Sequence, residues 1–145
     1  MEICSIGFTK RNAESFFEAL RAADIKQLID VRLNNTSQLA GFAKRDDLSY
    51  FLERILDVSY VHEPLLAPSQ AVLDEYKKNK GSWENYEVDF RKLMEERGIE
   101  RVMTPDRFTP RSVLLCSELT PDRCHRRLVI EYLSEKWGNV TAVHL

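Results

Sequence analysis

The chain has 145 residues, of which 43% are hydrophobic and 30% charged, and a formal net charge of -2. These values are typical of one soluble globular domain over residues 1–145, and they exclude a protein drawn to nucleic acid or anionic lipid by its overall charge. We find no run of about 18 apolar residues and no N-terminal signal pattern, and we therefore expect a cytoplasmic protein without a membrane partner. Three cysteines are an odd number for a disulfide scaffold, so free thiols are expected.

The first half of the chain alternates between strands and helices. Strands are predicted over residues 2–6, 27–31 and 58–62, where β-branched, aromatic and other apolar residues cluster. Asn12 can cap the first helix, and Asp46 or Asp47 is expected to cap the second. Apolar residues at helical spacing predict their core faces: Ala13, Phe16, Phe17, Leu20 and Ala23 in the first, and Leu48, Phe51, Leu52 and Ile55 in the second. Residues 32–44 are expected to form a long loop of the kind that is usually functional or mobile.

The second half continues this alternation. A weaker helix is predicted over residues 69–80, followed by a clearer helix that Ser82 caps and Gly98 ends. A strand is predicted over residues 112–116, where an unbroken apolar centre suits burial on both faces. Thr120 is expected to cap the last helix, with Pro121 at its first position, and residues 139–144 form a final strand.

This order of elements predicts an α/β fold. We expect a three-layer sandwich with a mostly parallel sheet of about five strands, helices on both faces and right-handed crossovers, in a Rossmann-like order of elements. The order of the strands within the sheet does not follow from the sequence.

Polar residues stand where the predicted strands end. In open parallel sheets, ligands bind outside the carboxyl ends of the strands, so these residues are candidates for a site. In chain order they are Gly7, Asp30 with Arg32 after it, His62, Cys116 with Glu118 after it, and His144. Every strand except the first ends in an ionisable residue, which indicates a polar site at this edge.

The sequence Cys124-His125-Arg126-Arg127 is expected to lie in the first two turns of the last helix. Unpaired backbone N–H groups and the positive end of the helix dipole there would lower the pKa of Cys124 and attract an anion. We therefore predict an enzyme that binds a small anionic or phosphorylated ligand, one that could resemble a nucleotide, without a cofactor.

The predicted roles are shared among several residues. Cys124 would be the nucleophile or anion anchor, His125 a proton carrier, and Glu118 or Asp30 a general acid or base. Arg32 and Arg126 would clamp the anion. Cys116, His62 and Gly7 would complete the ligand site.

Other interpretations use the same residues. Each cysteine could be a small packed core residue, and Asp30 with Arg32 could be a structural ion pair. A metal site formed by Cys116, Cys124, His125 and His62 is disfavoured, because adjacent residues on a helix point about 100° apart. A redox pair of Cys116 and Cys124 requires the turn between them to fold back.

Two alternatives concern the whole protein. One is a nucleic-acid-binding module, with basic residues of the loops and Phe42 or Phe108 for stacking, although the balanced charge does not favour it. The other is a scaffold protein whose polar cluster is structural.

Several stretches resemble one protein family. They are Ser5-Ile6-Gly7, the sequence from Leu28 to Arg32, the loop with Ser37 and Gly41-Phe42, the sequence from Tyr60 to His62, and the sequence from Leu114 to Glu118 followed by Cys124-His125-Arg126. In these stretches the chain resembles the domain-of-unknown-function family 488 (DUF488). The resemblance implies an α/β fold with a shared polar site and no assigned reaction. Phe8 stands where many members of the family carry a histidine.

Overall fold

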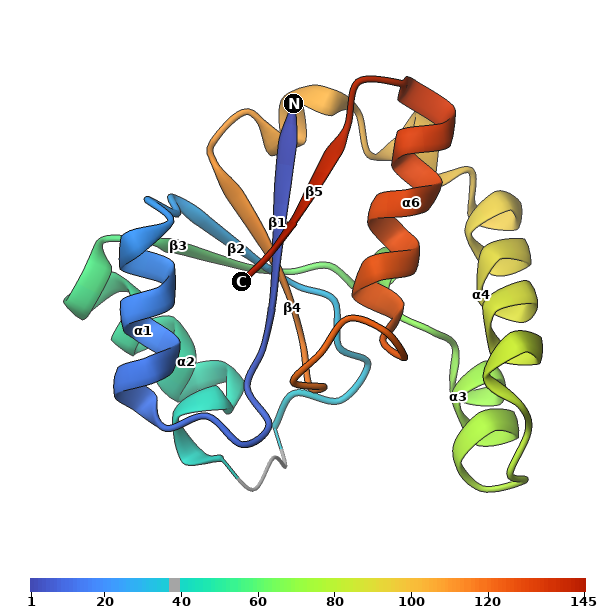
Figure 1. Ribbon diagram of the computed structural model, residues 1–145, viewed down its shortest axis with the longest axis horizontal. Helices are drawn as coiled ribbons and strands as arrows, with labels where there is room; N and C mark the ends of the chain where they lie inside the picture. Colours follow the sequence, from blue (N-terminus) through green and yellow to red (C-terminus); the bar gives the residue numbers. More distant parts are fainter. Residues whose placement is uncertain (37–39) are drawn as a thin grey trace.

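A sheet of five parallel strands forms the centre of the protein (Figure 1). The computed structural model describes residues 1–36 and 40–145. The strand order is β3-β2-β4-β1-β5. The strands are β1 (Glu2–Gly7), β2 (Gln27–Asp30), β3 (Ser59–His62), β4 (Ser112–Cys116) and β5 (Thr141–His144). The predicted α/β class and the parallel five-stranded sheet are confirmed.

Helices cover both faces of this sheet. They are α1 (Ala13–Ala22), α2 (Arg45–Phe51), α3 (Gln70–Lys77), α4 (Trp83–Arg97), α5 (Ile99–Val102) and α6 (His125–Trp137). In Figure 1, α1 and α2 lie on one side of the sheet, and α3, α4 and α6 lie on the other. None of the described helices has the length and apolar character needed to cross a membrane.

Alternate residues of the strands supply two separate cores. Ile6 packs in a cluster with Phe16 of α1, whereas Ile3 and Leu114 pack in the cluster that contains Phe90 of α4. This division follows from the period of two along a strand, which sends successive side chains to opposite faces. All five residues of β4 are buried, as the unbroken apolar run predicted.

The connections around β4 create a natural place for a ligand. β4 lies between β1 and β2. The helices that follow β1 and β2 cover one face of the sheet, but α6, which follows β4, covers the other (Figure 1). The chain therefore leaves neighbouring strands toward opposite faces, and this is where open α/β sheets bind ligands.

Three of the predicted helix ends are confirmed. The side chains of Asn12 and Ser82 accept hydrogen bonds from the backbone N–H groups of Ser15 and Asn85. Gly98 ends α4 in the left-handed conformation (φ 63°, ψ 42°) that this position favours.

The second helix differs from its prediction. Lys44, not Asp46 or Asp47, precedes α2, and both carboxylates lie in its first turn, where they interact favourably with the helix dipole. A π-helical turn over Leu52–Leu56 then changes the phase of the helix. As a result, Leu52 is fully buried but Ile55 is 43% exposed.

The start of the last helix was also predicted wrongly. α6 begins at His125, and residues 117–124 form an irregular loop. Side chains within α6 hold this loop: Arg126 binds the backbone oxygens of Glu118 and Leu119, and Arg127 binds the backbone oxygen of Pro121. The bond to Pro121 satisfies a carbonyl group that a helix beginning at Thr120 would have used itself.

Candidate functional site

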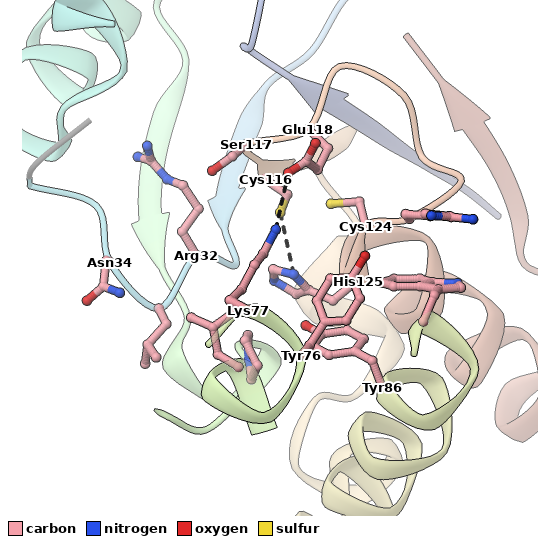
Figure 2. A pocket seen from close by; sticks show the side chains of 15 residues that line it. Arg32, Asn34, Tyr76, Lys77, Tyr86, Cys116, Ser117, Glu118, Cys124 and His125 are labelled. Carbon is pink, nitrogen blue, oxygen red and sulfur yellow. Dashed lines mark hydrogen bonds and ion pairs between the residues drawn. The ribbon is translucent and has the colours of Figure 1, made fainter. Parts of the chain in front are cut away.

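A cleft of about 290 Å³ opens at the carboxyl ends of β2 and β4. Its walls come from the residues that follow these two strands and from α3 and α4 (Figure 2). Cys116, Cys124 and His125 line this cleft together. It therefore lies at the edge of the sheet where the sequence predicted a site.

Cys116, Cys124 and His125 converge although they come from different local structures. Cys116 ends β4, Cys124 has extended backbone (φ −137°, ψ 137°) directly before α6, and His125 is the first residue of that helix. One donor atom from each residue lies within 4.8 Å of the others. All three are buried, with 2–7% of each residue exposed.

The orientation of the His125 ring follows from its two neighbours. Nε2 lies 2.6 Å from the backbone oxygen of Val31, which can only accept a hydrogen bond, so Nε2 carries a hydrogen. Nδ1 lies 3.4 Å from the sulfur of Cys116. The edge-to-face packing of His125 on Phe90, with ring centroids 5.4 Å apart, also fixes the ring.

The two thiols differ in acidity. A hydrogen bond from Cys124 lowers the pKa of the Cys116 thiol, and the backbone N–H groups of Ser117 and Glu118 lower it further against the opposing effect of burial. Burial raises the pKa of Cys124 far above its usual value, and its neighbour Cys116 adds to this increase. The expected low pKa of Cys124 was wrong, because this residue is buried and precedes the helix.

Arg126 lies beneath the site and does not line the cleft. Its side chain is fully buried. The guanidinium donates to Ser5 Oγ (3.2 Å) and to the backbone oxygens of Glu118 (2.5 Å) and Leu119 (3.3 Å). Arg126, which the sequence suggested as part of an anion clamp, therefore supports the loop that carries Glu118.

Asp30 and Arg32 form a buried ion pair at the end of β2. Arg32 Nε and Nη2 each lie 2.9 Å from a different oxygen of the Asp30 carboxylate. Tyr60 and Asn35 also donate to this carboxylate. Burial alone would raise the pKa of Asp30, but the hydrogen bonds and charge of Arg32 and the hydrogen bond of Tyr60 lower it. Asp30 is fully buried and does not line the cleft.

Arg32 keeps one donor available beside the cleft, which it lines. Within the described part of the chain, its Nη1 atom is buried and has no hydrogen-bond partner. The guanidinium lies 5.3 Å from the ring centroid of Phe8. Phe8 therefore packs against the guanidinium of Arg32.

Other residues expected at the site lie around its edges. Glu118 lines the cleft, is half exposed and lies 3.8 Å from Lys77 Nζ (Figure 2). His62 does not line the cleft, and its Nε2 bonds to the backbone oxygen of Arg32.

Gly7 lies next to Cys116 in the sheet, and a Cβ there would be 1.5 Å from the backbone oxygen of Glu118. His144 bonds to Ser5 away from the cleft. Ser37 lies outside the described residues.

The sequence did not predict that α3 and α4 contribute to the site. Lys77 and Tyr76 come from α3, and Trp83 and Tyr86 from α4. Tyr76 and Tyr86, whose ring centroids lie 5.1 Å apart, line the same cleft as His125 (Figure 2). Aromatic residues at helical spacing are typical of a core face, and only the packing of α3 on α4 and of α4 on α6 shows that these side chains also line a cleft. Arg123 is a further lining residue and is exposed.

The cysteine and histidine side chains are also suited to hold a metal ion. Among the described residues, Cys116, Cys124 and His125 form the group of metal-binding type with mutually close donor atoms. The sequence disfavoured such a site because Cys124 and His125 were expected to be consecutive helical residues. That expectation was wrong, because the extended backbone of Cys124 lets its side chain approach that of His125.

Comparisons with known proteins give a family. Neither a search of curated proteins nor a search of solved structures found a match. The family model described as "Domain of unknown function DUF488" matches residues 12–133, a range that includes Asp30, Cys116 and the Cys124-His125-Arg126 sequence. This match covers most of the chain and agrees with the resemblance found in the motifs. The protein belongs to the DUF488 family.

Proposed function

We propose that the protein is an enzyme that binds a small ligand with a phosphate or carboxylate group in this cleft and acts on it with Cys116, Cys124 and His125. One observation carries the proposal. A single cleft is lined both by these three reactive side chains and by the cationic side chains Lys77 and Arg123. Concave sites with a few convergent polar groups are where proteins usually bind small molecules.

The cations of the cleft are available to an anion. Arg123 is exposed, and no hydrogen bond or ion pair of its side chain is found within the described residues. Lys77 pairs with Glu118 at 3.8 Å, with both side chains at least half exposed. Such exposed pairs contribute little stability, so a ligand phosphate can replace the carboxylate at low cost. The free Nη1 of Arg32 adds a buried donor.

The remaining walls favour a ligand with an apolar or planar part. Tyr76, Trp83 and Tyr86 line the cleft together with Leu73 and Pro68. The volume of about 290 Å³ is at the lower end for small-molecule sites, which extend to about 1,000 Å³. A molecule of the size of a nucleoside monophosphate combines an anionic group with a planar ring and suits these walls.

The cleft also suggests a division of roles among the predicted residues. Cys116, Cys124, His125 and Glu118 line the cleft and would act on the ligand, whereas Lys77, Arg123 and Arg32 would bind its anionic group. Asp30 and Arg126 would be positioning residues, since both are fully buried and bonded to residues of the site.

The nucleic-acid alternative has less support. Phe108, one of the two proposed stacking residues, is 2% exposed. Arg111 donates both to Glu2 and to the backbone oxygen of Ala23, so its guanidinium already has two partners within the protein.

Ligand binding can be measured by calorimetry with a nucleoside monophosphate and with inorganic phosphate. We expect the double variant Lys77→Ala/Arg123→Ala to weaken binding at least about tenfold, because a hydrogen bond to a charged group contributes roughly 1.5–3 kcal/mol. Lys136→Ala is the matched control, since Lys136 lies on α6 and pairs with Glu95 outside the cleft. Equal affinity of the double variant and the wild type would contradict the proposal.

A further inference from the structure

The distances among Cys116, Cys124 and His125 suit tetrahedral coordination of a metal ion. In a tetrahedral zinc site with Zn–S bonds of about 2.3 Å and Zn–N bonds of about 2.0–2.1 Å, neighbouring donor atoms lie about 3.6–3.8 Å apart. Here Cys116 Sγ lies 3.4 Å from His125 Nδ1, and all three donor atoms lie within 4.8 Å of one another. Small side-chain rotations bring these atoms to the required separations.

The histidine is already oriented as a metal ligand. Histidines that bind metals donate their other ring N–H to a carbonyl or carboxylate, which fixes the ring and the tautomer. His125 donates from Nε2 to the backbone oxygen of Val31 at 2.6 Å. In the neutral imidazole, Nδ1 therefore carries a lone pair and lies 3.4 Å from the sulfur of Cys116. Packing against Phe90 holds the ring in this position.

The surroundings of Cys116 favour a coordinating sulfur. The loop after β4 begins directly after Cys116 with the backbone N–H groups of Ser117 and Glu118. Donors of this kind stabilise negative charge on the sulfur of a metal-bound thiolate. They come from the loop that Arg126 holds through the backbone oxygens of Glu118 and Leu119. The loop therefore supports the coordinating sulfur as well as closing one side of the cleft.

From these observations we infer that Cys116, Cys124 and His125 bind a thiophilic divalent cation of the zinc class, with its fourth coordination position open to the cleft. Two sulfur donors and one imidazole select such a cation over magnesium or calcium, which prefer oxygen ligands. Three protein ligands and an open fourth position are typical of catalytic rather than structural zinc sites. All three ligands line the cleft, so the fourth position faces the space available to a ligand.

This metal site deepens the proposed function. The three protein ligands stand on their own geometry, and only the identity of the fourth ligand rests on the proposed function. The anionic group of the small molecule would take the open position, and Lys77 and Arg123 would balance the remaining negative charge. The thiols then act as ligands of the ion and not as nucleophiles.

Metal binding can be tested on the full-length chain after treatment with a chelator. Zinc is titrated against a competing chelator, and cobalt is added separately because thiolate coordination gives it a charge-transfer absorption band in the near ultraviolet. We expect one zinc ion per chain, a thiolate band with cobalt, and no comparable binding of magnesium. Zinc binding no stronger than magnesium binding, or cobalt binding without a thiolate band, would overturn the inference.

Variants then locate the site. Cys124→Ser and His125→Asn should each weaken zinc binding by more than the roughly 10–100-fold that loss of an outer-shell partner causes. Cys4→Ala is the matched control, because Cys4 is the third cysteine of the chain and packs on the opposite face of the sheet. Unchanged affinity in both Cys124→Ser and His125→Asn would refute the assignment.

A second measurement does not depend on the folding of variants. In the wild-type chain, zinc should slow the alkylation of Cys116 and Cys124, located by peptide mass spectrometry, without changing that of Cys4. Equal alkylation with and without zinc would count against the site.

The two proposals can fail separately. Lys77→Ala/Arg123→Ala should keep full zinc affinity while losing the nucleoside monophosphate. If zinc does not bind but the ligand still depends on Lys77 and Arg123, the metal site is refuted and the proposed function stands. If zinc binds as expected but no ligand depends on these cations, the metal site stands and the proposed function is refuted.

Discussion

The backbone carbonyl of Glu118 passes over Gly7 so closely that a Cβ at Gly7 would lie 1.5 Å from the carbonyl oxygen. The loop after β4 can therefore occupy its position only because residue 7 has no side chain. We expect Gly7→Ala to displace this loop and to lower the free energy of unfolding by roughly 1–3 kcal/mol or more, as overpacking does. Urea denaturation measures the loss of stability. Gly41→Ala is the matched control, since a Cβ there meets no atom within 4 Å. Similar losses in the two variants would argue against the close contact.

Arg126 should stabilise the same loop from the side of α6. Arg126→Met removes the donors to Ser5, Glu118 and Leu119, which leaves buried polar groups unpaired. Each such group costs roughly 1–3 kcal/mol, so a large decrease in thermal stability is expected. Arg21→Met provides the comparison, because the Arg21 side chain is 54% exposed and its ion pair with Glu18 is on the surface. If Arg126 stabilises the loop, Arg126→Met should unfold at a clearly lower temperature than the wild type, whereas Arg21→Met should not. Equal unfolding temperatures of the two variants would contradict this role.

The buried pair of Asp30 and Arg32 predicts a pH dependence of stability. The pKa of Asp30 is lowered in the folded protein, so its ionised form stabilises the fold above the unfolded-state pKa of about 3.9. This contribution is lost as the pH falls below that value toward the folded-state pKa. Asp30→Asn leaves the charge of Arg32 buried without a partner and should cost about 3–5 kcal/mol at neutral pH.

The measurement is the urea midpoint of the wild type and of Asp30→Asn between neutral and acidic pH. We expect the difference between the two proteins to narrow below about pH 4, where the Asp30 carboxylate of the unfolded chain becomes protonated while that of the folded wild type is still ionised. Asp24→Asn is a useful comparison, because Asp24 is also paired but is 76% exposed. A constant difference between wild type and Asp30→Asn across this range would show that the carboxylate charge does not stabilise the fold.

The π-helical turn after α2 predicts opposite results for two apolar residues that are three positions apart. Leu52→Ala removes a fully buried side chain and should lower the free energy of unfolding by roughly 2–5 kcal/mol. Ile55→Ala should change it by less than about 1 kcal/mol, because Ile55 is 43% exposed. Comparable losses from both changes would mean that Ile55 is packed as the regular helical period predicted.

Local patterns in the sequence were sufficient for the fold class and for most helix ends. β-branched and apolar runs gave the strands, and Asn12, Ser82 and Gly98 marked helix boundaries because each satisfies a specific backbone requirement. The order of the strands was not predictable, because it depends on packing between segments that are distant in the sequence. β4 lies between β1 and β2 although it follows both by many residues.

Only part of the candidate site could be predicted, because the rest also depends on packing between segments that a local pattern does not show. The approach of His125 to Cys116 follows because the helix after a parallel strand starts near the carboxyl end of that strand. The start of α6 was misplaced because Thr120-Pro121 is a good helix-starting pair, and the side-chain bonds of Arg126 and Arg127 that hold an irregular loop there are not visible in a local pattern. Lys77 and Tyr76 belong to the site because α3 packs against α4, which in turn packs against α6. This arrangement of helices is not visible in a local pattern.

The central position of β4 also has a consequence for how the protein is made. While the chain emerges from the ribosome, β1, β2 and β3 are available first, but β1 and β2 are not neighbours in the finished sheet. They can join only when β4, which pairs with both, has been synthesised and inserted between them. Long-range pairing of this kind is slow to form and leaves strand edges open in the meantime. Cys116 is the last residue of β4, so the cleft that it lines with Cys124 and His125 is assembled only after β4 has joined β1 and β2.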